Sequence, residues 1–178
     1  MKAAVITFPG SNREGDVAKA LKQAGAEVTH VWHGDTELPA GTDLVVLPGG
    51  FSYGDYLRTG AIAGRAHIMD ATRAHAARGG YVLGICNGFQ IACEAGLLPG
   101  ILVRNAHLKF VCKRQYLKVE RNDTPYTSAY AKGQAIDVCI AHGEGNYIAD
   151  AETLARLEGE GLVAFRYADA EGNVTPAA

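Results

Sequence analysis

The chain has 178 residues, of which 48% are hydrophobic, and a formal net charge of -2. This length and apolar content predict one α/β domain spanning 1–178 around a single core. The charge balance gives no sign of a nucleic-acid or acidic-membrane partner. No apolar run approaches the ~20 residues that a membrane span needs, and we expect a soluble, cytoplasmic protein.

The first half of the chain alternates apolar strands with amphipathic helices. Ser11 and Glu14 stand at the spacing of a capping box, which predicts a first helix from there to about Ala24, stopped by Gly25. Strands apolar on both sides indicate a parallel sheet with helices on both faces, whose ligand sites lie at the carboxyl ends of the strands. The expected strands are 2–8, 27–32, 43–47 and 81–85, and the expected helices include 61–78 and one that begins at Asn87.

The second half has a different pattern. Segment 110–120 alternates apolar and charged residues, as a half-solvated strand does, and 135–141 and 162–167 look similar. Segment 169–173 is a hairpin turn signal. We therefore expect antiparallel strands that are added to the same domain.

The most specific motif is Gly84-Ile85-Cys86-Asn87-Gly88-Phe89-Gln90, where a buried strand runs into a helix. This pattern is typical of a nucleophile elbow, in which glycines two residues before and after the nucleophile relieve crowding. The start of the helix would also favour the thiolate form of Cys86. We interpret the remaining cysteines as structural: Cys93, Cys112 and Cys139.

Gly49 and Gly50 follow the strand 43–47 at another carboxyl end. Alone they would indicate a plain turn. Beside the elbow they predict half of an oxyanion hole, because successive glycines let backbone N–H groups approach a carbonyl closely. The expected donors are the backbone amides of Gly50 and Asn87.

Several common sites are missing from the sequence. No P-loop motif and no G-x-G-x-x-G spacing occurs, so the chain should bind neither ATP nor NAD itself. The cysteines form no C-x-x-C pair and have no zinc-like histidine spacing, so we expect no metal. Four histidines precede the elbow in the sequence. We expect them at strand ends or on helix surfaces: His30, His33, His67 and His75.

The elbow resembles the G-x-C-x-G-x-Q signature of class I (triad) glutamine amidotransferases, and Leu47-Pro48-Gly49-Gly50 resembles their oxyanion strand. Within that class, segments 7–12, 48–60 and 141–147 are similar to the glutaminase subunits of phosphoribosylformylglycinamidine synthases. The resemblance implies a flavodoxin-like fold and hydrolysis of glutamine to glutamate and ammonia.

The resemblance also implies the roles of the residues. Cys86 would form the glutamyl thioester, Gly50 and Asn87 would donate to its oxyanion, and Gln90 would help to hold glutamine. The ammonia would pass to a synthetase that makes formylglycinamidine ribonucleotide in purine biosynthesis. ATP and Mg are expected on that large synthetase subunit, and a small accessory subunit is expected beside it.

One departure concerns the base. The family has a His-Pro-Glu near its C-terminus, and no such triplet occurs up to Ala178, so we expect that the C-terminal segment of the family is lacking. His142 and Glu144 have the same H-x-E spacing and are predicted either to line the site or to stand in for the pair. Two alternatives stay open here: a cysteine hydrolase or chaperone of the oxidative-stress superfamily, and a catalytically silent interaction subunit.

Overall fold

A computed structural model describes residues 1–174. The chain folds as two compact units, Met1–Val103 and Arg104–Ala178, which are described separately below. That the chain forms one amidotransferase domain stays a prediction.

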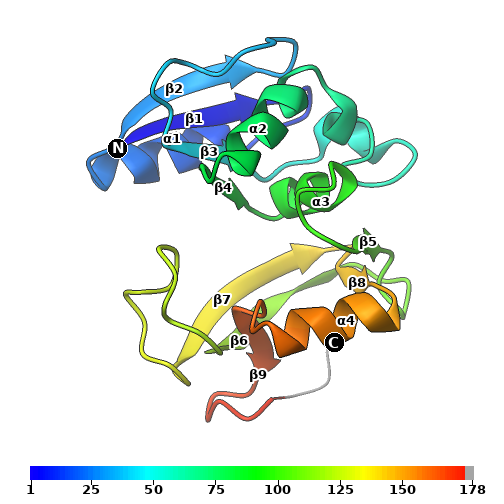
Figure 1. Cartoon of the computed structure of the whole chain (residues 1–178). Helices are drawn as coiled ribbons and strands as arrows, with labels where there is room; N and C mark the ends of the chain where they lie inside the picture. The colour runs from blue at the N-terminus through cyan, green and yellow to red at the C-terminus, as the bar shows by residue number, and fades with distance from the viewer. Residues whose placement is uncertain (175–178) are drawn as a thin grey trace. The chain divides into compact units, whose positions relative to one another are not determined.

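Unit 1 contains a parallel sheet in the strand order β2-β1-β3-β4 (Figure 1). Its registers are continuous: Ala3 of β1 pairs with Val28 on one side and with Leu44 on the other. The sequence prediction of a parallel α/β sheet is confirmed. The strands are β1 (Lys2–Thr7), β2 (Glu27–Trp32), β3 (Leu44–Leu47), β4 (Tyr81–Gly84) and, at the end of the unit, a short β5 (Ile101–Val103).

Helices cover both faces of this sheet, as expected. Alternate residues of β1 point to opposite faces, so Ala4 and Ile6 join one core cluster while Ala3 and Val5 join the other. The first cluster packs against α2 and α3, and the second packs against α1. The helical elements are α1 (Glu14–Gln23), α2 (Ile68–Ala77), α3 (Asn87–Glu94) and the 3-10 turns η1 (Ser52–Asp55) and η2 (Ala63–Arg65).

The predicted capping box at the first helix is wrong. The helix begins at Glu14 with Arg13 as its N-cap, and no side chain caps it. The Ser11 hydroxyl instead accepts the backbone N–H of Phe8 at 3.0 Å, because Ser11 belongs to a turn that forms a β-bridge with Gly50. The end of the helix agrees with the sequence, since the amide of Gly25 bonds to the carbonyl of Lys22 at 3.0 Å.

The single helix expected over 61–78 is also wrong. The turn η2 and the helix α2 are separated at Ala66, whose ψ of 151° is extended. Close backbone packing sets this path: a Cβ added to Gly60 would lie 2.8 Å from the nitrogen of Ile91, and one added to Gly64 would lie 3.1 Å from that of Ala95. Although the helix is interrupted, apolar residues of this segment still pack in the core, among them Ile68 and Met69.

Unit 2 holds an antiparallel sheet in the order β7-β6-β9, which confirms the antiparallel strands expected in the second half. The turn predicted at 169–173 is present, because the amide of Asp169 bonds to the carbonyl of Asn173 at 2.9 Å. The sequence did not predict helix α4, whose N-cap Asp150 accepts the amide of Thr153 at 2.7 Å. The elements are β6 (Val111–Val119), β7 (Ala135–His142), β8 (Asn146–Ile148), α4 (Ala151–Gly159) and β9 (Phe165–Ala168).

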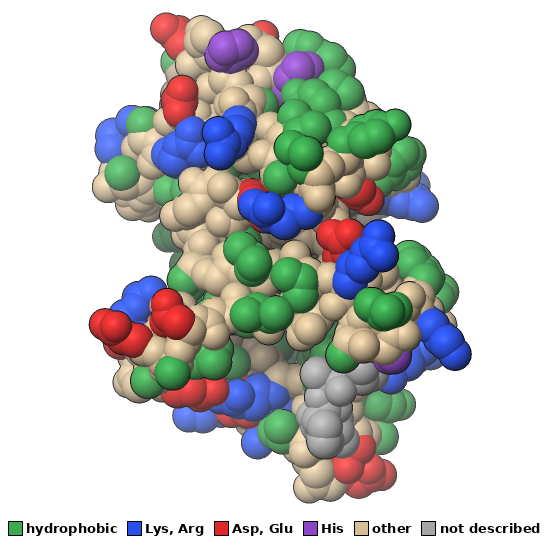
Figure 2. Space-filling view, turned by 90° about the vertical axis from the view of Figure 1, so that its right-hand side faces the viewer, with side chains coloured by type: hydrophobic (Ala, Val, Ile, Leu, Met, Phe, Trp, Pro, Cys, Tyr) green, Lys and Arg blue, Asp and Glu red, His purple; other side chains and the backbone are tan. Residues whose placement is uncertain are grey.

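The surface carries both signs of charge. Figure 2 shows Lys and Arg side chains interspersed with Asp and Glu on the face that it presents, as the formal net charge of -2 suggests. Within residues 1–174, no helix combines the length and the apolarity that a bilayer span requires.

Candidate active site

Cys86 sits on a sharp turn between β4 and α3. Its φ of 53° and ψ of -111° are rare for a residue with a side chain, as a nucleophile elbow demands. Two hydrogen bonds hold the turn: Ile85 N–H donates to the carbonyl of Leu47 at 3.0 Å, and Gly88 N–H donates to that of Ile85 at 2.8 Å. The thiol of Cys86 is exposed and can therefore meet a substrate.

The glycines on either side of Cys86 are required by backbone packing. A Cβ on Gly84 would lie 2.6 Å from the carbonyl oxygen of Gly88, and a Cβ on Gly88 would lie 1.8 Å from that of Leu47. Neither obstacle is a flexible side chain that could move away. The crowding predicted from the sequence is confirmed at both positions, and it fixes α3 against the end of β3.

The Gly49-Gly50 turn lies beside the nucleophile. A Cβ on Gly49 would be 3.5 Å from the Cβ of Cys86. Gly50 has a φ of +151°, and a Cβ there would lie 2.8 Å from the carbonyl oxygen of Gly10. Only glycine suits this position.

The two amides predicted to form the oxyanion hole are unused. Gly50 bridges to Ser11, and the hydrogen bonds of that bridge are made by its neighbours, so its own N–H points elsewhere. Asn87 is the first residue of α3, where helical amides have no internal acceptor. Among residues 1–174, neither amide has a hydrogen-bond acceptor. Both donors are therefore available to a developing negative charge, although their role stays a prediction.

The side chains of Asn87 and Gln90 point into the protein. They are 1% and 9% exposed, and Asn87 Nδ2 donates to Gln90 Oε1 at 3.0 Å. Asn87 Oδ1 accepts the backbone N–H of Ser52 at 3.0 Å. The sequence motif pointed to Gln90 as a substrate contact, which stays a prediction, but it gave no sign of this buried amide network.

The other cysteines differ from Cys86. Cys93 is 6% exposed, and burial, with a smaller contribution from Glu94, raises the pKa of its thiol to about 11. Such a thiol is protonated and inert at neutral pH. Cys112 on β6 and Cys139 on β7 are exposed, so the packing role expected of the three applies only to Cys93.

His142 and Glu144 belong to unit 2, where β7 ends. The buried Asn105 organises this loop: its Nδ2 donates to the carbonyls of Lys109 at 2.8 Å and His142 at 3.0 Å. Its Oδ1 lies 3.0 Å from the amide of Gly145 and 2.9 Å from His142 Nδ1. No sequence motif singled out Asn105, because two of its partners, His142 and Gly145, are 37 and 40 positions away.

These contacts define the state of His142. Asn105 Oδ1 can only accept, so His142 Nδ1 carries the proton and Nε2 carries the lone pair. That Nε2 is buried and has no partner among residues 1–174. Burial lowers the pKa of His142, and His107 and Lys113 lower it further. The imidazole is therefore neutral at pH 7, with an unused basic nitrogen.

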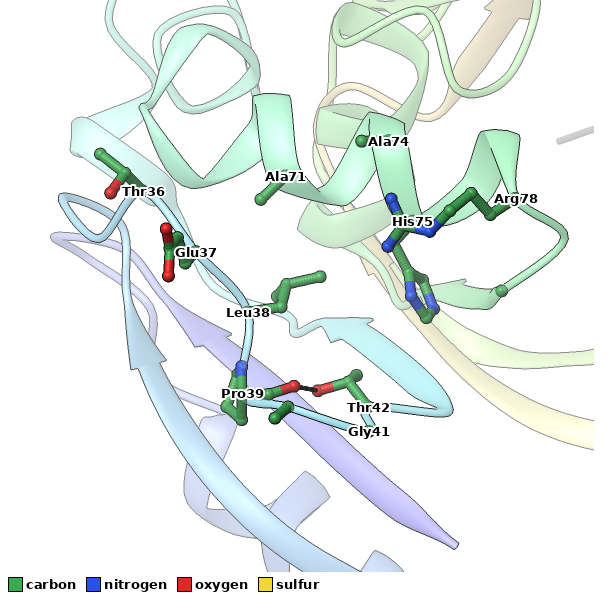
Figure 3. A pocket seen from close by; sticks show the side chains of 12 residues that line it. Thr36, Glu37, Leu38, Pro39, Gly41, Thr42, Ala71, Ala74, His75 and Arg78 are labelled. Atoms are coloured by element: carbon green, nitrogen blue, oxygen red, sulfur yellow. Dashed lines mark hydrogen bonds between the residues drawn. The ribbon is translucent and has the colours of Figure 1, made fainter.

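A separate hollow of about 630 Å³ lies at the amino ends of β3 and β4, opposite the strand ends that lead to Cys86. Figure 3 shows Leu38 and Pro39 on one wall, and His75 of α2 with Arg78, the C-cap of that helix, on the other. Thr42 Oγ1 donates to the Pro39 carbonyl at 2.7 Å and fixes that loop. The residues that line this hollow include neither a cysteine nor a serine, so the predicted thioester chemistry does not involve it. Within the described residues, no group of His, Cys, Asp or Glu is arranged to hold a metal ion.

Known proteins are similar to this chain along its whole length. Residues 1–178 match a family described as the CobB/CobQ-like glutamine amidotransferase domain. A protein of Bradyrhizobium diazoefficiens named phosphoribosylformylglycinamidine synthase subunit PurQ is 65% identical over 179 residues, which cover 100% of this chain and 77% of the relative. The protein of that name in Rhodopseudomonas palustris strain HaA2 is 65% identical over 175 residues, covering 98% and 75%.

Solved structures give the same result. The structure of PurLQS from Thermotoga maritima matches with a TM-score of 0.83 and 43% identity, over 97% of this chain and 77% of that one. A glutamine amidotransferase from the same organism matches with a TM-score of 0.58 and 16% identity, over 85% and 64%, which supports the fold alone.

Proposed function

The chain belongs to the CobB/CobQ-like glutamine amidotransferase family and to its phosphoribosylformylglycinamidine synthase subunits, and we propose that it releases ammonia from glutamine at Cys86. One observation carries this proposal: an exposed cysteine on a strained elbow lies beside two backbone amides that have no acceptor within residues 1–174. The function is that of the glutaminase subunit in purine biosynthesis.

In the proposed mechanism, the Cys86 sulfur attacks the side-chain carbonyl carbon of glutamine. The carbonyl oxygen becomes an oxyanion that the N–H groups of Gly50 and Asn87 stabilise. Collapse of this intermediate breaks the C–N bond, and the nitrogen leaves as ammonia after it gains a proton. Water then hydrolyses the thioester and releases glutamate.

The departing nitrogen must gain a proton. A base can deliver that proton after taking it from the thiol or from water. We propose that His142 and Glu144 line the site, which is the role that their motif implies. Gln90 is proposed to help hold glutamine.

We further propose that the ammonia passes to a large synthetase subunit, in a complex that also holds a small accessory subunit. The likeness to PurLQS supports this, with PurL as the synthetase and PurS as the accessory subunit. ATP and Mg would then bind the synthetase. The two alternatives from the sequence are not favoured, because relatives at 65% identity are subunits of this synthase.

Replacement of the nucleophile tests the proposal. In the assembled complex, Cys86→Ala should abolish synthesis from glutamine and leave synthesis from ammonium salts unchanged, because the thiol acts only in ammonia release. Cys93→Ala is the matched control and should retain both activities. Glutamine hydrolysis that survives Cys86→Ala would refute the proposal, and loss of both activities would make Cys86 a structural residue.

A further inference from the structure

The side chain of Asn87 joins two parts of the elbow region that the backbone leaves apart. It is 1% exposed, and it uses both ends of its amide: Oδ1 accepts from Ser52 N–H and Nδ2 donates to Gln90 Oε1, each at 3.0 Å. The donor at Ser52 is a backbone amide, so the orientation of the Asn87 side chain is determined.

Ser52 connects this amide to the oxyanion hole, because it follows Gly50 by two residues. The same stretch is held from the opposite side by Phe51 N–H, which donates to Gly10 at 3.1 Å, and by Tyr53 N–H, which donates to Pro9 at 2.7 Å. The loop that carries one oxyanion donor is thus clamped between the turn after β1 and the side chain of the other donor.

The loop also contains strained backbone that would relax if one of these hydrogen bonds were lost. Tyr53, Asp55 and Leu57 adopt positive φ angles of 53°, 57° and 69°. Side-chain-bearing residues keep such conformations only where surrounding contacts impose them. Loss of the bond to Ser52 N–H would let this strained segment relax, and Gly50 at its start would shift with it.

We propose that the side chain of Asn87 is a positioning residue that fixes the separation of the Gly50 and Asn87 backbone donors around the oxyanion. This inference rests on the proposed function. The proposal also explains why residue 87 is an asparagine, because this position needs a buried, uncharged group that both accepts and donates a hydrogen bond. Aspartate lacks the donor, and leucine of similar size lacks both.

The role has a kinetic signature. The oxyanion exists only after attack, so misplaced donors slow turnover and leave glutamine binding and thiol access nearly unchanged. A merely structural role would instead lower stability without separating kcat from KM.

The test uses Asn87→Ala in the complete subunit assembled with its synthetase. Glutamine hydrolysis should lose about 10- to 100-fold in kcat while KM changes less than about threefold. Alkylation of Cys86 by iodoacetamide and synthesis from ammonium salts should both persist. The matched control is Thr72→Ala, which truncates another fully buried side chain of unit 1, bonded to the Ile68 carbonyl at 3.0 Å; it should keep wild-type kcat.

Equal kcat in Asn87→Ala and wild type, or an equal loss in Thr72→Ala, overturns the positioning role. If Asn87→Ala does not fold, Asn87→Ser carries the test, because it keeps a polar side chain and removes the amide oxygen that accepts from Ser52 N–H. Its kcat should fall at least about tenfold, and an unchanged kcat overturns the inference. Hydrolysis that persists in Cys86→Ala would instead refute the proposed function, so the two failures are distinguishable.

Discussion

Gly88→Ala should distort the elbow, because it adds a methyl group where α3 packs against the end of β3. The new Cβ would lie 1.8 Å from the carbonyl oxygen of Leu47 and 2.5 Å from its carbonyl carbon, so the obstacle is the backbone of a buried strand. Overpacking of a well-packed site costs about 1–3 kcal/mol, and a contact this short belongs at or above about 3 kcal/mol. For a protein of this size, that corresponds to a fall in Tm of about 6–12 °C.

The same contact should also lower activity. Relief of the contact moves the start of α3 away from β3, and both the Cys86 thiol and the Asn87 amide move with it. We expect kcat for glutamine hydrolysis to fall by about 100-fold or more. Gly15→Ala is the control: nothing lies within 4 Å of its added Cβ, and alanine should stabilise α1 by about 0.5 kcal/mol. A folded Gly88→Ala variant with wild-type Tm and kcat would refute the account of the elbow.

Three further changes test other parts of the structure. Cys93→Ala should cost about 1 kcal/mol in urea unfolding, as a small buried truncation, and should leave glutamine-dependent synthesis intact. Asp150→Ala removes the N-cap bond to Thr153 and should cost about 1 kcal/mol, with Glu152→Ala as the control. The lowered pKa of His142 makes the folded state bind fewer protons than the unfolded one, so stability should decline as pH falls below about 6.5. His142→Gln should show a smaller decline between pH 7.5 and 5.5, and an identical decline would contradict the assignment.

Much of unit 1 follows from short-range patterns in the sequence. The strand β2 has the predicted bounds Glu27–Trp32, and β1 ends one residue before the predicted Phe8. Continuous apolar runs specify buried parallel strands, because both faces of each strand must be covered. The elbow was predictable for a related reason: at the junction of a strand and a helix, glycines two residues before and after a cysteine are typical of a turn too tight for side chains there.

The errors have a common cause, which is competition from partners distant in sequence. Ser11 has the residue type and spacing of a helix cap, yet its turn is fixed by the bridge to Gly50, 39 positions later. The apolar period over 61–78 is helical, yet Gly60 and Gly64 pack on the backbone around α3, and the chain is extended at Ala66. Local sequence patterns reflect local conformational preference, whereas tertiary contacts determine the structure at Ser11 and over 61–78.

The parts of the site that the sequence could not predict are buried amides. Asn87 reaches Ser52 over 35 positions, and Asn105 reaches Gly145 over 40. An asparagine in a loop or at a helix start usually indicates a turn or a cap, so neither residue stands out. What distinguishes them is complete use of donor and acceptor away from water, which only the folded chain reveals.

The proposed oxyanion hole would follow from two ordinary structural features that occur side by side. A helix start always leaves its first amide without an internal acceptor, and α3 places that amide at Asn87, directly after the nucleophile. A single β-bridge between Ser11 and Gly50 has its hydrogen bonds on the neighbouring residues, which leaves the Gly50 amide without an acceptor in the described part of the chain. What the sequence must add is close approach, and it does so with glycine at 50 and 88, where a Cβ would clash with the turn after β1 and with the end of β3. The arrangement of this site therefore depends on positions that have no side chain, and for that reason a methyl group at Gly88 is expected both to slow the reaction and to weaken the fold.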